Sequence, residues 1–392
     1  MKILSVNAGS SSLKFRLFEM PDEKVLISGV FERIGIGNSF YTIKIGEEKI
    51  KKEVNLENHK DAFQYLVQEL LENKIIDTLK DIKGIGNRIV QGGSYFDRSV
   101  IATEDVISKI DELSILGPLH NPPAIVGIRA EQEVFKDAVL TTVFDTSFHQ
   151  TMPEYNYMYA LPYEWDNDFK IRRYGAHGTS HKYVAKRMNE ILGREDTKLI
   201  TCHIGNGASI SAVVDGKCLN TSMGLTPNAG LIMGSRCGDI DATIVTYMME
   251  HQKITPQEMD TILNKKSGLL GISGVSSDAR DIEQGIKEGN KRCMLANKMY
   301  VRKIVDYIAK YYVEMAGCDA IIFTAGVGEN GIQTRKEVLD ELKVLGVLID
   351  EEANNCRGKE VCITKKESKI PVYVLPTDEE LMIARDTYEL VK

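Results

Sequence analysis

The sequence has few of the features that mark nucleic-acid-binding or membrane-spanning proteins. Basic residues are in deficit, because 49 Lys and Arg stand against 56 Asp and Glu and leave a net charge of −7. Nucleic-acid-binding domains are usually basic, so nucleic acid is not an expected partner. Long hydrophobic runs are also missing, since no uninterrupted apolar stretch approaches the ~20 residues of a membrane span. A membrane is therefore not an expected partner either.

Cysteine is absent from the first half of the chain, and the cysteines of the second half do not follow the spacing of a metal site or disulfide framework. The seven cysteines are Cys202, Cys218, Cys237, Cys293, Cys318, Cys356 and Cys362. Their number is odd and no two are spaced as C-x-x-C, so neither a disulfide framework nor a zinc site is indicated. The first residues also lack the basic and apolar regions of a signal peptide. We therefore expect reduced thiols and a cytoplasmic location.

The chain is long enough to predict two domains rather than one. It has 392 residues, of which 43% are hydrophobic and 27% charged, as is typical of a soluble globular protein. Apolar alternation in the first half predicts strands at 2–6, 13–18, 24–29, 40–45 and 49–52, an amphipathic helix at 60–73, and buried strands at 82–89 and 139–144. The first five strands are expected to form an antiparallel meander.

The second half repeats this order of elements with negligible sequence identity. Strands are predicted at 199–203, 209–214 and 217–219, a later strand at 321–324, and helices at 242–250, 255–265, 282–288 and 294–316. The order indicates a structural duplication. We expect an N-terminal domain at 1–150 and a nucleotide-binding domain at 151–378, with a last helix at 379–392 that packs back on the first domain.

Three glycine-containing turns, each after an apolar run, are the most informative local features. They are residues 7–12, residues 203–207 (His203, Ile204, Gly205, Asn206 and Gly207), and residues 326–330 (Gly326, Val327, Gly328, Glu329 and Asn330). Tight turns after strands direct backbone N–H groups toward one point, where they bind phosphate. One such turn is usually only a hairpin. Three together predict several loops that converge on one nucleotide.

Four charged or titratable residues lie where a solvated surface is a poor explanation. Arg88 lies in an apolar segment, Asp145 ends a predicted strand, and His177 and Arg236 lie among small residues. Arginines can neutralise phosphoryl oxygens and an acceptor carboxylate. A histidine can donate a hydrogen bond to the transferring group, and an acid can hold Mg²⁺ or orient the acceptor. Alone, Arg88 or Asp145 could equally form an ordinary salt bridge; together the four indicate phosphoryl transfer.

Longer motifs make the sequence similar to the acetate kinases along its whole length. The matching segments are Asn7-Ala8-Gly9-Ser10-Ser11-Ser12-Leu13-Lys14, residues 118–123, Phe144-Asp145-Thr146, residues 173–181, residues 221–224, residues 323–330 and residues 376–381. They occur in the same order as in that family. Motifs of this length are specific.

The resemblance implies an α/β fold of two duplicated actin-like ATPase (ribonuclease H-like) domains with a nucleotide cleft between them, usually in a homodimer. It implies reversible transfer of the γ-phosphoryl group of ATP to acetate, which gives acetyl phosphate and ADP. The transfer is expected to be direct and in line, with Mg²⁺ as cofactor and Mn²⁺ as a possible substitute. Positioning and charge neutralisation would then supply most of the rate.

The same resemblance implies roles for individual residues. Asp145, His177 and Arg236 match the catalytic residues, and Asn7 and Glu379 match those associated with the metal ion. The residues that match the acyl-substrate site are Arg88, Val90, Leu119, Ala176 and Pro227. The residues that match nucleotide contacts are Lys14, the two loops at 203–207 and 326–330, and Asp278, Ala279 and Arg280.

The chain departs from the family pattern at a few of these positions. Asn87 and Gln91 replace the histidines that usually flank the substrate arginine, and neither can become cationic. Ala176 replaces a phenylalanine, which could widen the acyl pocket and favour propionate or butyrate. Ala279 replaces an aromatic residue near the adenine. The alternatives to an acetate kinase are a kinase for longer acids, a pyrophosphate-using relative, and a nucleotide-binding regulator without turnover.

Overall fold

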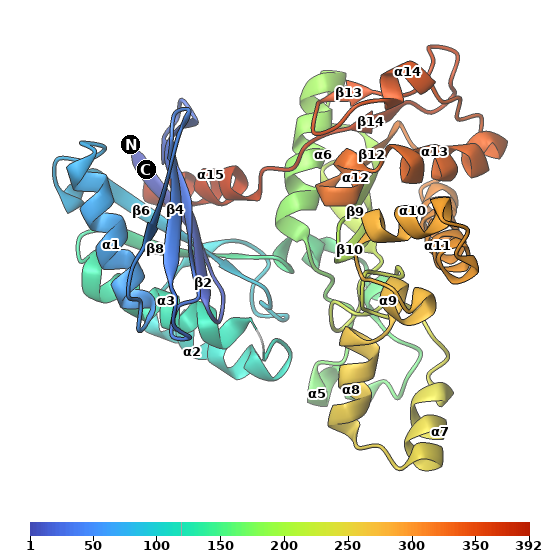
Figure 1. Ribbon diagram of the computed structural model, residues 1–392, viewed down its shortest axis with the longest axis horizontal. Helices are drawn as coiled ribbons and strands as arrows, with labels where there is room; N and C mark the ends of the chain where they lie inside the picture. The colour runs from blue at the N-terminus through green and yellow to red at the C-terminus, as the bar shows by residue number, and fades with distance from the viewer. Residues whose placement is uncertain (119) are drawn as a thin grey trace. The chain divides into compact units, whose positions relative to one another are not determined.

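An eight-stranded and a six-stranded sheet form the centres of two units in this computed structural model, which describes residues 1–118 and 120–392 (Figure 1). Unit 1 comprises Met1–Gln150 and Asp378–Lys392, and unit 2 comprises Thr151–Thr377. The predicted Leu119 lies outside the described residues. Among the described helices, none is both long enough and apolar enough to cross a membrane.

The sheet of unit 1 joins an antiparallel meander to parallel strands. Its strands are β1 (Lys2–Ala8), β2 (Ser12–Glu19), β3 (Lys24–Glu32), β4 (Phe40–Ile45), β5 (Glu48–Glu53), β6 (Ile82–Ile89), β7 (Val100–Ile101) and β8 (Val139–Phe144). They lie in the order β5-β4-β3-β2-β1-β6-β8-β7. Strands β1, β6 and β8 are parallel, whereas β1 to β5 pair antiparallel with their neighbours. The predicted meander and buried strands are confirmed.

Helices cover both faces of this sheet because β1 is apolar on both of its faces. The helices of unit 1 are α1 (His59–Glu72), α2 (Glu104–Glu112), α3 (Asn121–Val134) and α15 (Glu379–Val391), with short 3-10 turns η1 (Leu79–Asp81) and η2 (Leu113–Ile115). Leu4 and Val6 belong to the core that α1 and α3 cover. Ile3, one residue out of phase, packs on the opposite face with Ala384 of α15.

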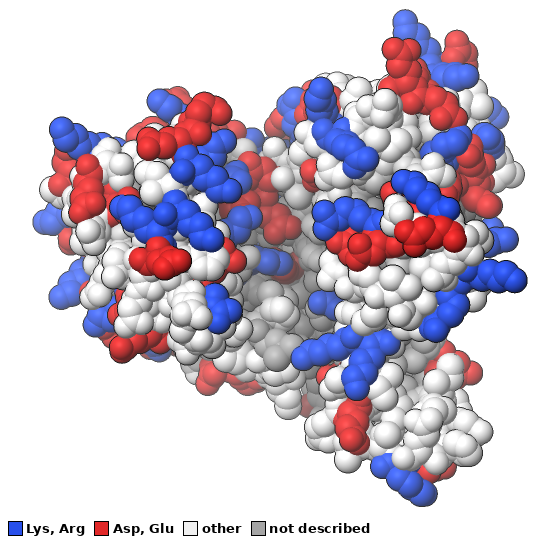
Figure 2. All heavy atoms as spheres, viewed as in Figure 1, with Lys and Arg blue, Asp and Glu red and all other residues white. Residues whose placement is uncertain are grey.

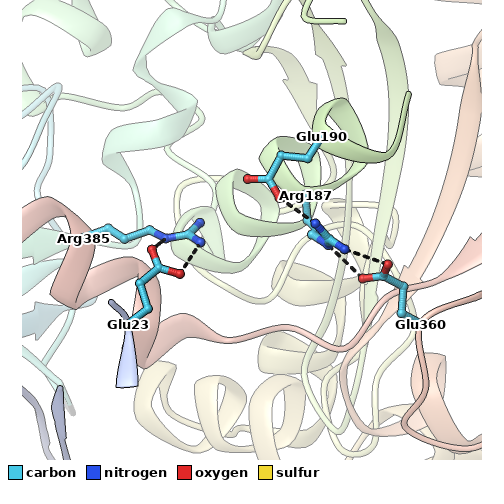
Figure 3. Close-up of polar contacts among 5 residues, drawn as sticks. All are labelled: Glu23, Arg187, Glu190, Glu360 and Arg385. Carbon is cyan, nitrogen blue, oxygen red and sulfur yellow. Dashed lines mark hydrogen bonds and ion pairs between the residues drawn. The ribbon is translucent and has the colours of Figure 1, made fainter. Parts of the chain in front are cut away.

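Helix α15 is held against unit 1 by close packing and by ion pairs. A Cβ atom at Gly84 would lie 2.9 Å from Thr387 Cγ2, so only glycine lets the helix approach strand β6 this closely. Arg385 of α15 donates from Nε and Nη2 to the carboxylate of Glu23, at 2.6 and 2.9 Å (Figure 3). Arg16 donates to Asp378, the N-cap of the helix, at 2.7 Å.

Unit 2 repeats the strand plan of unit 1. Its strands are β9 (Lys198–Ile204), β10 (Ala208–Val214), β11 (Lys217–Thr221), β12 (Ala320–Thr324), β13 (Val361–Cys362) and β14 (Val372–Val374). They lie in the order β11-β10-β9-β12-β14-β13. Strands β9 to β11 form an antiparallel meander and β9, β12 and β14 are parallel, as β1, β6 and β8 are in unit 1. The predicted duplicated α/β fold is confirmed.

Unit 2 is richer in helices than the sequence patterns predict. Its helices are α4 (Glu154–Tyr157), α5 (Glu164–Phe169), α6 (Gly178–Leu192), α7 (Thr243–Gln252), α8 (Pro256–Lys265), α9 (Gly268–Ser273), α10 (Ala279–Lys287), α11 (Lys291–Glu314), α12 (Ala325–Asn330), α13 (Ile332–Glu341) and α14 (Glu351–Asn354), with 3-10 turns η3 (Ser147–Thr151), which begins in unit 1, and η4 (Leu342–Leu345). The four helices predicted in this region are confirmed as α7, α8, α10 and α11. Arg187 of α6 donates to Glu190 and Glu360, which ties the helix to the loop before β13 (Figure 3).

The three glycine segments take two different forms. Residues 9–11 and 205–207 connect paired antiparallel strands, so the first two segments are hairpin loops. The third is not a turn as predicted, because residues 325–330 form helix α12. Strand β12 passes directly into the helix at Ala325, whose φ is +66°, and the Ala325 N–H donates to Glu329 Oε1 at 2.8 Å. The glycines that follow lie within the helix.

Basic and acidic side chains are interspersed on the face of the molecule seen in Figure 2. On this face the net charge of −7 is not gathered into one acidic patch.

Candidate functional site

Three predicted site residues of unit 1 lie at one edge of its sheet. Asn7 is near the end of β1, Arg88 is near the end of β6, and Asp145 follows β8. These strands are parallel neighbours, so their carboxyl ends meet at the same edge. In open α/β sheets that edge is where ligands bind. Residues far apart in the sequence are in this way brought together within unit 1.

Arg88 and Asp145 form a two-point ion pair at this edge. Arg88 Nε donates to Asp145 Oδ1 at 3.1 Å, and Nη2 donates to Oδ2 at 2.7 Å. The Asp145 side chain is 2% exposed, whereas that of Arg88 is 22% exposed. The Asp145 carboxylate raises the pKa of Arg88 further above its ordinary value. Arg88 is thus a cation held in place by a buried carboxylate, with part of its side chain still exposed.

Two acids of helix α15 lie close to this pair. Burial raises the pKa of Glu379, and the charge of Arg88 partly opposes that shift. Burial acts in the same upward direction on Glu380. Its pKa is nevertheless lowered, because Lys14 donates a hydrogen bond to it and the charges of Lys14 and Arg16 favour the carboxylate. Lys14, a predicted nucleotide contact, is ion-paired within unit 1.

The oxygen atoms at this edge suit a hard cation. Asn7 offers an amide oxygen and Glu379 a half-buried carboxylate, and both are ligand types that Mg²⁺ accepts. Among the described residues, no group of three or more His, Cys, Asp or Glu side chains could hold a metal by itself. A Mg²⁺ ion commonly takes only one or two carboxylates and completes its shell with water and substrate phosphates. The donor set therefore fits Mg²⁺ bound together with a nucleotide.

The residues that flank Arg88 are buried and serve the fold. Asn87 is 2% exposed and donates to Glu131 Oε2 of helix α3 at 2.7 Å. Gln91 is 4% exposed, and its Oε1 accepts the Gly93 N–H at 2.9 Å. Burial raises the pKa of Glu131 to about 8. The two departures from the family pattern thus replace titratable rings by neutral amides in the packing beneath Arg88.

In unit 2, His177 is held in a defined orientation at the start of α6. Its backbone is left-handed, with φ +59°, a conformation that costs energy for a residue with a side chain. Its Nδ1 lies 2.9 Å from Ser209 Oγ. Its ring stacks on His203, with ring centroids 4.0 Å apart and an angle of 21° between the planes. The predicted His203 therefore contacts His177, and its Nδ1 lies 2.8 Å from Ser180 Oγ.

Arg236 and His177 approach one point beside the β9–β10 loop. A Cβ atom at Gly207 would lie 3.5 Å from Arg236 Nη1 and 3.6 Å from His177 Nε2. Arg236 Nη1 donates to the carbonyl of Pro227 at 3.0 Å. Burial lowers the pKa of Arg236. A half-buried guanidinium and an imidazole that meet at a glycine make a site for an anion with several oxygens.

A cavity of about 740 Å³ in unit 2 contains many of the predicted nucleotide residues. Gly205, Asn206, Asp278, Ala279, Arg280, Gly326, Val327 and Asn330 line it, together with Gly234, Leu269, Ser277, Glu283, Tyr300, Gly331 and Arg357. It has the size of a small-molecule site. Asp278 caps helix α10 and accepts from Arg280 Nη2 at 2.5 Å, and this bond lowers the pKa of Asp278. The second and third glycine segments thus meet at one cavity.

Other predicted nucleotide residues lie beside the cavity rather than in its described lining. Ile204 and Gly328 are buried in the core of the unit. Gly207 faces His177 and Arg236, as described above. Glu329 accepts the N–H groups of Ala325 and Thr377, at 2.8 and 3.2 Å. These residues shape the backbone around the cavity.

Sequence reasoning missed several residues of unit 2 that this arrangement uses. Gly234 lies so close to the β9–β10 loop that a Cβ there would overlap the Asn206 side chain. Tyr300 of α11 and Arg357 line the cavity. The sequence signal for Gly234 was its place next to Ser235 and Arg236, where two small residues precede an arginine. Nothing local distinguishes Tyr300 from a core residue of an amphipathic helix.

The acyl-site residues are divided between the units. Val90 is half-buried in unit 1, whereas Ala176 and Pro227 belong to unit 2. Ala176 is 3% exposed and packs in the core of that unit. The acyl pocket that these residues would form therefore stays a prediction.

A larger cavity of about 1320 Å³ lies between α9 and α11 in unit 2. Its described lining mixes apolar residues such as Ile240 and Leu295 with charged ones such as Lys303, and it includes none of the predicted site residues. The predicted nucleotide residues that line a cavity are thus in the smaller one.

Sequence comparison places the chain beside one group of enzymes. The profile of the Acetokinase family matches residues 2–385. The chain is 52% identical over 393 residues to the acetate kinase of Bacillus subtilis (strain 168), with all of both chains covered. It is 48% identical to the acetate kinase of Onion yellows phytoplasma, covering 100% of this chain and 95% of the relative.

Solved structures agree over the full chain. The acetate kinase of Porphyromonas gingivalis is 45% identical with a TM-score of 0.94, and 100% of each chain is covered. A propionate kinase from Francisella tularensis is 42% identical with a TM-score of 0.93 at the same coverage. The acetate kinase of Entamoeba histolytica is 35% identical with a TM-score of 0.90, covering 100% and 99% of the chains.

Proposed function

The chain belongs to the acetokinase family and catalyses ATP-dependent phosphorylation of acetate, and we propose that it does so by direct in-line transfer with the residues described above. Because it is an enzyme of this family, the regulator without turnover is not retained. Acetate and ATP are its substrates. The roles of individual residues, the metal ion, the assembly state and the compartment are proposals.

The observation that carries the proposal is the double role of the β9–β10 loop in unit 2. Gly205 and Asn206 line the 740 Å³ cavity, and Gly207 lies against His177 and Arg236. A nucleotide bound in the cavity with its phosphates along this loop would present its terminal phosphoryl group to both side chains. Arg236 would neutralise the phosphoryl oxygens, and His177 would donate a hydrogen bond to them in the transition state.

We assign the acceptor side of the reaction to Arg88 and Asp145. Acetate and the γ-phosphoryl group are both anions, so they repel each other unless a cation binds the acceptor. Nε and Nη2 of Arg88 donate to Asp145, and no partner among the described residues engages Nη1. We propose that Arg88 Nη1 binds the acetate carboxylate, and the bonds that Nε and Nη2 donate to Asp145 support this by fixing the orientation of the guanidinium.

We propose that Asn7 and Glu379 hold Mg²⁺ together with the nucleotide phosphates. The bound ion would neutralise charge on those phosphates. Glu379 is half-buried, and this desolvation already raises its pKa and disfavours its charged form. A cation at its carboxylate would offset that cost.

Acetate is the leading acid, and propionate is the alternative that one observation favours. Ala176 stands where the family usually has phenylalanine, and a propionate kinase is among the structural relatives at 42% identity. Each additional buried methylene contributes ~0.8 kcal/mol, so a wider pocket would favour a longer acid. Ala176 is packed in the core of unit 2, so neighbouring groups fill the space that a phenylalanine would take. This packing supports a small acyl pocket and therefore acetate as the preferred acid.

Hydroxamate trapping of the acyl phosphate tests this choice. Purified protein with Mg-ATP would be compared on acetate, propionate and butyrate under identical conditions. A higher kcat/KM for acetate supports the proposal. A higher value for propionate or butyrate makes Ala176 the specificity residue, and Ala176→Phe should then restore the preference for acetate. No acyl phosphate with any acid would contradict the proposal.

A homodimer and a cytoplasmic location are further proposals. Large side chains such as Tyr155, Tyr163 and Phe169 of unit 2 are 77%, 64% and 65% exposed, which supports a covered surface in an assembly. The cysteines are free thiols, which supports a reducing compartment. Sedimentation equilibrium would measure the assembly state, and a monomer at micromolar concentration would contradict the proposed homodimer.

A further inference from the structure

A polar face runs along β9 and β10 in unit 2, opposite the apolar core. Ile200 and Cys202 of β9, and Ile210 and Ala212 of β10, point into the core cluster. Their neighbours alternate to the other face of the sheet, as strand geometry requires. These alternate residues are Thr201, His203, Ser209 and Ser211, and the side chains of helix α6 meet Thr201, His203 and Ser209.

One hydroxyl on this face links two imidazoles. Ser209 Oγ lies 2.9 Å from His177 Nδ1 and 2.8 Å from His181 Nε2. On its far side, His181 Nδ1 lies 2.7 Å from Thr201 Oγ1. Ser209, His181 and Thr201 are completely buried. The result is a hydrogen-bonded chain that begins at His177 and continues into the interior of the unit.

The single hydroxyl proton of Ser209 makes the two rings dependent on each other. Ser209 can donate to one imidazole and must then accept from the other, if both bonds are to be made. When Ser209 donates to His177 Nδ1, His177 carries its proton on Nε2, and His181 donates from Nε2 to Ser209. His181 Nδ1 then accepts the Thr201 hydroxyl proton.

The opposite direction makes His177 Nε2 an acceptor. Thr201 would then donate to the carbonyl of Ser211 at 3.4 Å, which is long for a hydrogen bond. The three short bonds of this chain are kept in both directions. A phosphoryl oxygen at His177 Nε2 would select the direction in which that nitrogen donates.

We propose that Ser209, supported by His181 and Thr201, is a positioning residue that orients His177 and sets its Nε2–H tautomer for the transferring phosphoryl group. The proposal rests on the proposed function, because it needs His177 to act on that group. Within unit 2, His203 stacks on His177, Arg236 approaches the same point beside Gly207, and His181 bonds the same Ser209 hydroxyl. A neutral imidazole that donates from Nε2 avoids a second cation beside Arg236.

Ser209→Ala, with Ser211→Ala as its matched control, tests the positioning role in the full-length protein. Both serines are buried on the same face of β10, but Ser211 bonds Thr221 and not His177. We expect similar thermal destabilisation in both variants. Only Ser209→Ala should lower kcat, by about tenfold or more, and the KM values for ATP and acetate should change little. The loss should be smaller than the fall of about 10²–10³ in kcat that follows when a transition-state donor is removed outright. Equal kcat in the two variants would overturn the proposal.

A double-mutant cycle tests whether His181 acts through Ser209. If it does, His181→Phe lowers kcat in the wild-type background and has little additional effect in the Ser209→Ala background. If the kcat losses of the two single variants multiply in the double variant, the two residues act independently, and the proposed coupling through the hydrogen-bonded chain is overturned. His177→Ala is measured in parallel. Full turnover in His177→Ala would contradict the proposed function itself. If His177→Ala loses turnover and Ser209→Ala keeps it, only the present inference is contradicted.

Nitrogen-15 NMR of the histidines reads the tautomer without using activity. With a non-hydrolysable ATP analogue and Mg²⁺ bound, His177 should show an unprotonated Nδ1 and a protonated Nε2. Ser209→Ala should weaken this preference, and Ser211→Ala should not. A His177 ring protonated at Nδ1 in the wild-type complex, whether alone or at both nitrogens, would overturn the assigned direction.

Discussion

Arg88 and Asp145 lie 57 positions apart in the sequence, yet the guanidinium donates to both carboxylate oxygens, at 3.1 and 2.7 Å. They meet because β6 and β8 are parallel neighbours that end at the same edge of the sheet. The pair fixes a cation whose remaining N–H groups are directed elsewhere. This geometry makes the acceptor site the most directly testable part of the protein.

Arg88→Ala should raise the KM for acetate by about 10- to 100-fold and also lower kcat, because a hydrogen bond to a charged group contributes about 1.5–3 kcal/mol. Steady-state kinetics with varied acetate at saturating ATP measures both effects. The variant also leaves Asp145 buried without its cation, so its thermal unfolding must be compared. Arg98→Ala is the control, since Arg98 is 77% exposed in the same unit. An unchanged KM for acetate in a folded variant would contradict the assignment.

Arg236→Ala should lower kcat by about 10²-fold or more and leave both KM values within a few fold, because its charge is assigned to the transition state. Arg302, exposed on α11 and paired with Asp306, provides a control in the same unit. The measurement is initial rate against ATP and acetate. A higher KM for ATP at normal kcat would instead make Arg236 a ground-state nucleotide contact.

Gly326→Ala should raise the KM for ATP several-fold without loss of thermal stability. Gly326 lines the 740 Å³ cavity, and nothing in the described protein lies within 4 Å of a Cβ there. The added methyl group therefore occupies ligand space rather than protein space. Helix α12 should gain slightly from the exchange of glycine for alanine. Unchanged ATP affinity by calorimetry would mean that the nucleotide binds away from α12.

Glu379→Gln should raise the Mg²⁺ concentration needed for half-maximal activity, because a neutral amide is a poorer ligand for a hard cation. Titration of Mg²⁺ at fixed ATP measures this, and excess EDTA should abolish turnover in the wild-type protein. Glu380→Gln is the comparison. Glu380 is the neighbouring acid and is paired with Lys14 and Arg16. Equal Mg²⁺ dependence in the two variants would contradict a metal role for Glu379.

Glu131→Gln should make the protein more stable than the wild type at alkaline pH and not at acidic pH. Burial raises the pKa of Glu131 from 4.5 to about 8, so the folded state binds a proton that the unfolded state releases. Wild-type stability should therefore fall as pH rises from about 4.5 to about 8 at this site. The amide keeps an acceptor for Asn87 and has no charged form.

Thermal unfolding measured between about pH 5 and pH 9 checks this sign. The difference in Tm between Glu131→Gln and the wild type should grow with pH. Glu133→Gln, at an exposed position of the same helix, should show no such trend. A constant difference across the range would mean that Glu131 is already ionised in the folded protein.

The positions of most strands along the chain were predictable because burial leaves a period of two in the sequence. Strands at 40–45 and 82–89 were predicted to the residue, and so was the repetition of the meander in the second half. Helix α6 was missed, since it begins with Gly178, Thr179 and Ser180, which are poor helix formers. Helix α12 was interpreted as a turn because its glycines are more common in loops.

The sequence alone determined the family, the duplicated strand plan and the residue types that the chemistry needs, because these are recorded in local motifs and in the spacing of apolar residues. The tertiary structure alone decided which of those residues meet. The Arg88–Asp145 pair depends on the order and register of β6 and β8, and the chain from His177 to Ser209 and His181 depends on packing of α6 against β9 and β10. Such contacts join residues distant in the sequence, and no local pattern encodes the register that brings them together.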